Sequence, residues 1–139
     1  MKNILVSILL IFLIVGIFAF SKSYTTAAIA VVNVGKISEY PPGTIKFINK
    51  AKTFVISDEE GIYAVSSVCT HLGCIINQKE KELVCPCHGA KFDISGKVLS
   101  GPAKQDLNWY HLELGKENNI ILDTATAVNK GTKLPYPSK

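Results

Sequence analysis

The sequence predicts an all-β domain of antiparallel strands, built as a sandwich or barrel and preceded by one N-terminal hydrophobic helix. Three observations support this. After residue 30 the apolar residues form short runs separated by turn residues, at spacings of about 8–12 residues. No apolar pattern of helical period follows residue 30. Before it, Ile4–Phe20 carries no charge and one polar side chain, Ser7.

The N-terminal segment, residues 1–21, predicts a membrane anchor or an export signal. As a helix, Ile4–Phe20 would span about 25 Å, close to the lower limit for crossing the hydrocarbon core. A signal peptide would be cleaved after the small-residue pattern Ala28–Ala30, but the apolar stretch is long for such a signal, which favours an anchor. In both cases the domain is exported. Residues 22–31 are expected to form a linker.

Each predicted strand is an apolar run beside a turn. Thr53–Ile56 and Ile62–Val65 flank the turn residues Asp58–Gly61, which indicates a β-hairpin. Further strands are predicted at Lys91–Ile94, Val98–Leu99, Leu107–Leu114 and Ile120–Leu122.

Composition limits the classes of function. The chain has 139 residues and is 47% hydrophobic, which fits one folded domain and excludes intrinsic disorder. The net charge is +4, and the basic residues, all lysine, alternate with acids as in Lys79–Glu82. Such interleaving is typical of a solvated surface, so we expect no nucleic acid partner. Residues 32–123 are expected to form the domain, and residues 124–139 a C-terminal tail over its surface.

The four cysteines lie in two blocks. The first is CTHLGC, residues 69–74, and the second is CPCHG, residues 85–89. Clustered Cys and His indicate metal or redox chemistry. A structural zinc site normally uses paired Cys-x-x-Cys ligands, and two disulfides would leave both histidines unexplained. A nucleophilic Cys–His pair lacks an evident third residue to orient it. These three alternatives therefore fit the spacing poorly.

Together the two blocks resemble the double signature of the Rieske iron–sulfur family, in the form found in Rieske subunits of quinol-oxidising cytochrome bc complexes. The resemblance includes both additional cysteines, extends over residues 32–123, and takes in GKVLSGPA at residues 96–103. It implies a Rieske-type antiparallel fold with an inserted cluster-binding subdomain at about residues 69–99. It also implies one 2Fe-2S cluster per chain.

The resemblance assigns the four ligands. Cys69 and Cys85 would bind one iron, and His71 and His88 the other. Because neutral imidazoles replace two thiolates, the cluster carries less negative charge and accepts an electron more readily. The two histidines would face the quinol and couple proton transfer to electron transfer.

Further roles follow from the same resemblance. Cys74 and Cys87 would form a disulfide that clamps the two ligand loops, a bond that persists in an oxidising compartment. Leu72 would form part of an apolar docking surface, the alternative being a buried leucine. Gly101 and Pro102 would belong to a loop that covers the cluster.

The sequence departs from the family pattern beside the cluster. High-potential members carry Ser directly after CPCHG and Tyr two positions later, and these hydroxyls favour the reduced state. Here the positions are Ala90 and Phe92, which cannot donate. A lost charge-assisted hydrogen bond of about 1.5–3 kcal/mol corresponds to roughly 60–130 mV. We therefore expect a lower potential and a low-potential donor such as menaquinol. Lys104 replaces the second proline of the covering loop, and the chain has no twin-arginine export signal.

The sequence thus predicts the iron–sulfur subunit of a membrane quinol–cytochrome reductase, rather than an enzyme on its own. It would pass one electron from quinol to a cytochrome, with b-type and c-type cytochrome subunits as partners and the domain on the extracytoplasmic side of the cell membrane. The alternative is a stand-alone exported Rieske carrier, or a small subunit of another oxidoreductase such as an arsenite-oxidase-like enzyme. His111 is expected to be a solvent-facing strand residue.

Overall fold

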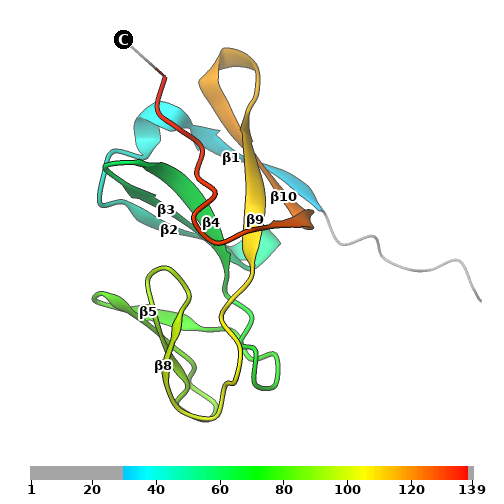
Figure 1. Ribbon diagram of the computed structural model, residues 1–139. Helices are drawn as coiled ribbons and strands as arrows, with labels where there is room; N and C mark the ends of the chain where they lie inside the picture. Colours follow the sequence, from blue (N-terminus) through cyan, green and yellow to red (C-terminus); the bar gives the residue numbers. More distant parts are fainter. Residues whose placement is uncertain (1–29, 138–139) are drawn as a thin grey trace, which may run out of the picture.

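The computed structural model describes residues 30–137, which form two antiparallel sheets (Figure 1). The larger sheet has the strand order β1-β10-β9-β4-β3-β2, and the smaller has the order β5-β6-β7-β8. The strands of the larger sheet are β1 (Val31–Lys36), β2 (Ile45–Ile48), β3 (Thr53–Asp58), β4 (Gly61–Ser66), β9 (Trp109–Leu114) and β10 (Asn119–Val128). Those of the smaller sheet are β5 (Asn77–Lys79), β6 (Glu82–Val84), β7 (Lys91–Asp93) and β8 (Val98–Ser100). Short 3-10 helices cover Ile37–Glu39, Asn49–Ala51 and Lys116–Asn118.

The smaller sheet is an insertion into the larger one. Strand β4 pairs directly with β9, with Val65 opposite Trp109, although more than forty residues of chain separate them. The intervening residues, 67–108, contain the smaller sheet and its loops, which form the lower lobe in Figure 1. The prediction of an all-β fold with an inserted subdomain is therefore confirmed in its architecture.

The hairpin of β3 and β4 is buried on both faces, so it forms the layer between two hydrophobic cores. On one face Phe54 and Tyr63 pack in the same core as Cys69 and Cys85 of the insertion. On the other face the side chains of the hairpin pack against β1 and β10. Because both faces are covered, each strand has an uninterrupted apolar run, Phe54–Ile56 and Ile62–Val65, rather than an alternating pattern. The predicted hairpin is present, and it connects the insertion to the centre of the domain.

The C-terminal segment is fastened to this hairpin. Strand β10 continues to Val128, beyond the predicted domain boundary at residue 123, because it keeps pairing with β9 after an irregularity in the register. Leu134 then exchanges two backbone hydrogen bonds with Ile62, at 2.9 and 2.7 Å. The Lys133 ammonium contacts the Asp58 carboxylate at 2.6 Å. The segment predicted as a surface tail thus begins with the last five residues of β10, and most of its later residues are exposed.

The predicted N-terminal helix lies outside the described residues, and so does the predicted linker except for its last two residues. Strand β1 starts at Val31 and pairs there with Asp123 of β10. From residue 30 to residue 137, no helix is long and apolar enough to span a bilayer.

Candidate metal centre

Two loops of the insertion carry the predicted ligands. Loop 1 comprises residues 69–74, and a bridge between Val68 and Ile75 closes its base. Within it, the Cys69 carbonyl accepts a hydrogen bond from the Gly73 N–H at 2.9 Å. The Cys69 N–H donates to the Cys74 carbonyl at 2.8 Å. These two bonds close the loop around the first cysteine.

Loop 2, residues 85–90, repeats the same hydrogen-bond frame. The Cys85 carbonyl accepts from the Gly89 N–H at 3.1 Å, and the Cys85 N–H donates to the Ala90 carbonyl at 2.8 Å. A strand pair between Val84 and Lys91 closes its base. In each loop the first residue is therefore a cysteine held by the residues four and five positions later.

The glycine at the fifth position of each loop has a left-handed backbone, with φ +78° at Gly73 and +72° at Gly89. No atom would lie within 4 Å of a Cβ added at either position. Glycine is thus required by the backbone conformation and not by lack of space. The shared frame depends on this conformation, since both glycine N–H groups close their loops.

The first cysteines of the two loops are buried side by side. Cys69 and Cys85 are both free thiols, and only 3% and 2% of their surfaces are exposed. Burial raises the pKa of the Cys69 thiol, the backbone N–H of His71 partly offsets this, and the adjoining Cys85 thiol raises the pKa further. Two negative charges placed side by side in an apolar core need a cation to compensate them. The pair therefore suits a metal centre bound through both sulfurs.

The two predicted histidine ligands also meet. The ring centroids of His71 and His88 lie 4.9 Å apart, with the ring planes at 87°. The Nδ1 atom of His71 is buried and has no hydrogen-bond partner among the described residues. An unpaired buried nitrogen is costly, and coordination of a metal by Nδ1 would satisfy it. His88 is exposed. The thiol pair and the histidine pair together fit a mixed-ligand iron–sulfur site.

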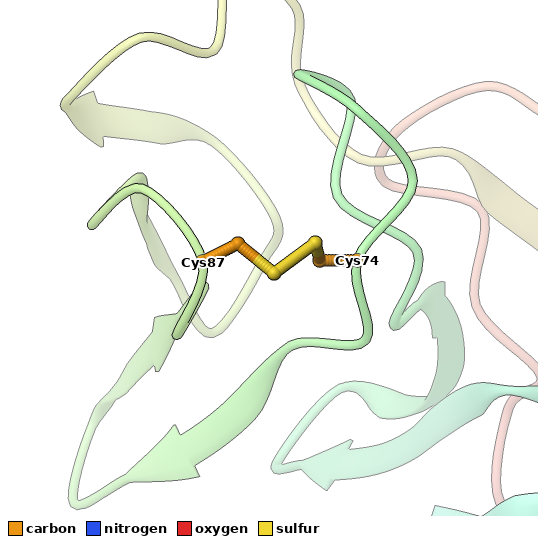
Figure 2. Close-up of a disulfide and its surroundings, with 2 residues drawn as sticks. All are labelled: Cys74 and Cys87. Carbon is orange, nitrogen blue, oxygen red and sulfur yellow. A yellow bond between two sulfur atoms is a disulfide. The ribbon is translucent and has the colours of Figure 1, made fainter.

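A disulfide between Cys74 and Cys87 joins the two loops, as the sequence resemblance implies (Figure 2). Its Cα atoms are 6.5 Å apart, and it closes a chain separation of 13 residues. A cross-link of this span stabilises a fold by about 3 kcal/mol, mainly by restricting the unfolded chain. Because loops of this kind have few contacts of their own, the disulfide limits how far they can separate.

The sulfur of Cys85 lies beside this disulfide. The Sγ atoms of Cys74, Cys85 and Cys87 are all within 4.8 Å of one another. Three clustered sulfurs resemble a thiolate metal site, but two of them are already bonded to each other. Since metal ligation needs thiolates, the disulfide removes Cys74 and Cys87 as ligands. Cys85 remains available, and its partner is Cys69.

A third loop, residues 101–106, packs against the end of loop 2 and is tied to loop 1. Gly101 packs so closely on loop 2 that a Cβ added there would lie 2.6 Å from the Ala90 Cα. The Thr70 hydroxyl donates a hydrogen bond to the Gln105 carbonyl at 2.6 Å. Pro102 is half-buried between these contacts. Sequence reasoning missed Thr70 and Gln105, because neither residue type carries a signal for a contact across 35 residues.

The remaining predicted residues lie at the edges of the site or away from it. Leu72 projects from loop 1 with 69% of its surface exposed, so it is not the buried leucine of the alternative interpretation. Ala90 and Phe92 are fully buried in the core that contains both free thiols. His111 is half-buried in β9 opposite Asp123, rather than fully solvent-facing.

The paired thiols and the paired histidines of these loops are the side chains that a mixed-ligand iron–sulfur cluster would require. Residues 28–111 match the Rieske 2Fe-2S domain, so the chain belongs to the Rieske family and its cofactor is a 2Fe-2S cluster. The solved plasma membrane Rieske protein PetC3 of Synechocystis PCC 6803 is 38% identical, with a TM-score of 0.52. The alignment covers 66% of this chain and 98% of that protein.

Two curated relatives are both named cytochrome b6-f complex iron-sulfur subunit. The one from Chlorobaculum thiosulfatiphilum is 39% identical over 94 residues, which cover 65% of this chain and 52% of the relative. The one from Prochlorococcus marinus is 33% identical over 113 residues, which cover 75% of this chain and 64% of the relative. The chain therefore spans between half and two thirds of the length of these relatives.

Replacing Gly101 with alanine tests the close packing of the third loop on loop 2. The new Cβ would clash with the Ala90 backbone, and φ is +91°, so we expect a destabilisation of about 2–4 kcal/mol. If this loosens the cover, chelator should bleach the visible absorption of the bound cluster about tenfold faster or more. Gly131→Ala is the matched control, because φ there is +95° and nothing lies within 4 Å. Equal bleaching rates in the two variants would contradict a covering role.

Proposed function

We propose that this chain is the iron–sulfur subunit of a membrane quinol–cytochrome reductase. The observation that carries the proposal is the meeting of a buried thiol pair, Cys69 and Cys85, with a histidine pair at the surface end of the same loops. The similarity to cytochrome b6-f iron–sulfur subunits supports the assignment to a quinol-oxidising complex. The disulfide across the loops supports an extracytoplasmic position.

We assign Cys69 and Cys85 as ligands of one iron and His71 and His88 as ligands of the other. When bound, a 2Fe-2S cluster supplies a one-electron acceptor and donor. The buried Nδ1 of His71 is the ring nitrogen that would face iron. The opposite nitrogen, Nε2, is then the atom that can hold and release a proton at the quinol. Electron and proton would leave the quinol at one imidazole.

The docking surface of this proposal takes in the exposed His88 of loop 2 and the exposed Leu72 of loop 1. Leu72 is the most exposed of the large apolar side chains in the described chain, and it neighbours His71 in loop 1. An exposed leucine beside a polar imidazole suits a partner pocket that is apolar and excludes water. Gly101 and Pro102, in the covering loop, would shield the opposite side of the cluster.

The proposed partners follow from the proposed reaction. A b-type cytochrome subunit would hold the quinol, and a c-type cytochrome would accept the electron. Residues 1–21 would anchor the chain in the cell membrane. The predicted linker, residues 22–31, would join this anchor to the domain, which begins where Val31 of strand β1 pairs with Asp123.

We propose that the cluster operates in the lower part of the Rieske range, which suits menaquinol as the donor. The side chains of Ala90 and Phe92 are fully buried in the core of the free thiols and carry no hydrogen-bond donor. Without such donors the added negative charge of the reduced cluster is less stabilised. A midpoint potential above about +250 mV would contradict this part of the proposal.

Purification of the full chain from its native membranes tests the proposed complex. We expect a b-type cytochrome to co-purify with it, and menaquinol to reduce the cluster in that preparation. If the chain is recovered with its cluster but no cytochrome, the proposed complex is wrong and a stand-alone carrier is the better assignment.

Introducing a donor beside the cluster tests how the potential is set. Ala90→Ser should raise the midpoint potential by about 60–130 mV, if the hydroxyl donates to a cluster or ligand sulfur. A redox titration followed by electron paramagnetic resonance measures it. Ala64→Ser is the control, since Ala64 is equally buried but lies in the other core. An unchanged potential in an Ala90→Ser protein that retains its cluster would contradict the explanation.

A further inference from the structure

The disulfide that clamps the loops has a free thiol next to it. Cys85 is unpaired, and its Sγ lies within 4.8 Å of both sulfurs of the Cys74–Cys87 bond. Cys69 adjoins Cys85 but does not belong to this three-sulfur group among the described residues. Thiol–disulfide exchange needs a thiol close to a disulfide sulfur, and among the described residues Cys85 is the free thiol that lies beside this bond.

We propose that Cys74, Cys85 and Cys87 form a thiol–disulfide exchange site in the chain when it carries no cluster. The Cys85 thiolate attacks Sγ of Cys74, the Cys74–Cys87 bond breaks, and Cys87 leaves as a thiolate. The proton lost by Cys85 is regained by Cys87 through solvent. One S–S bond forms and one breaks, so no oxidant or reductant is consumed.

The structure favours attack on Cys74 over attack on Cys87. A Cys74–Cys85 bond again joins loop 1 to loop 2, so the two loops stay linked. A Cys85–Cys87 bond would close a ring containing only Pro86 between the cysteines and would leave the loops unlinked. The leaving sulfur also belongs to an exposed residue, because Cys87 is exposed whereas Cys85 is buried.

The exchange has a consequence for the site. It moves the free thiol from the buried position of Cys85 to the exposed position of Cys87, where small reagents can modify it. It also takes one proposed iron ligand out of use. This last consequence rests on the proposed ligand role of Cys85, whereas the exchange itself does not.

Mapping of the disulfides in the full chain tests the proposal. A chelator removes the cluster in the absence of denaturant, added thiol and oxygen. Acid then stops the exchange at chosen times. The free thiols are alkylated, and mass spectrometry identifies the labelled cysteines and the cross-links. We expect a Cys74–Cys85 cross-link to appear with time, with the label moving from Cys85 to Cys87. A Cys74–Cys87 bond that persists throughout, or a label that moves to Cys74, would overturn the proposal.

Two matched variants separate exchange from loss of the cluster, since each removes one proposed ligand. Cys85→Ser should abolish the change of cross-link, and Cys69→Ser should retain it. Near-ultraviolet circular dichroism, which reports the buried Trp109, checks that each variant is folded. If a variant does not fold, the disulfide map of the unsubstituted chain still tests the exchange site.

The cluster-bound chain distinguishes this inference from the proposed function. If Cys85 binds iron, the bound chain should keep its Cys74–Cys87 bond, while the cluster-free chain exchanges. Exchange at the same rate in both would support the exchange site and contradict the ligand role of Cys85. If the Cys74–Cys87 bond persists in both the cluster-bound and the cluster-free chain, the exchange site is wrong, and the ligand role of Cys85 is not affected.

Discussion

The burial of two cysteine thiols side by side is the constraint on which the site depends. Cys69 and Cys85 lie in a core that also contains side chains of the hairpin β3–β4, so the candidate metal centre is continuous with one of the two hydrophobic cores of the domain. Burial raises the pKa of the Cys69 thiol there, and the adjoining Cys85 thiol raises it further. A cation bound between them resolves this cost, and the loops, the disulfide and the covering loop all serve to keep the two sulfurs together.

The two ligand loops are one structural solution used twice. Both hold a cysteine by hydrogen bonds to the residues four and five positions later, and both need a left-handed glycine to do so. They differ in the histidine, which is the third residue of loop 1 and the fourth residue of loop 2. The shared hydrogen bonds hold Cys69 and Cys85 in equivalent positions of the two loops. The histidines are not in equivalent positions, and their rings meet edge to face with centroids 4.9 Å apart. The disulfide is likewise asymmetric, because Ala90 occupies in loop 2 the place that Cys74 has in loop 1.

Much of this arrangement could be predicted from local sequence, and the rest could not for physical reasons. The hairpin over residues 53–66 has strong turn residues between apolar runs, and the two cysteine blocks are specific enough to indicate the cofactor. Strand β5 is polar and fully exposed, so no apolar pattern marks it. The extension of β10 and the pairing of Leu134 with Ile62 depend on contacts between distant residues. The shared loop frame is a property of backbone hydrogen bonds, which residue types alone do not show.

The central claim is that two histidines and two cysteines of these loops bind one 2Fe-2S cluster. Pulsed electron paramagnetic resonance on the reduced full chain, with nitrogen-15 confined to histidine, tests it most directly. We expect strong couplings from two histidine nitrogens, with one lost in His71→Cys and one lost in His88→Cys wherever the variant keeps a cluster. A cluster signal without histidine nitrogen coupling would contradict it, since all the ligands would then be sulfur.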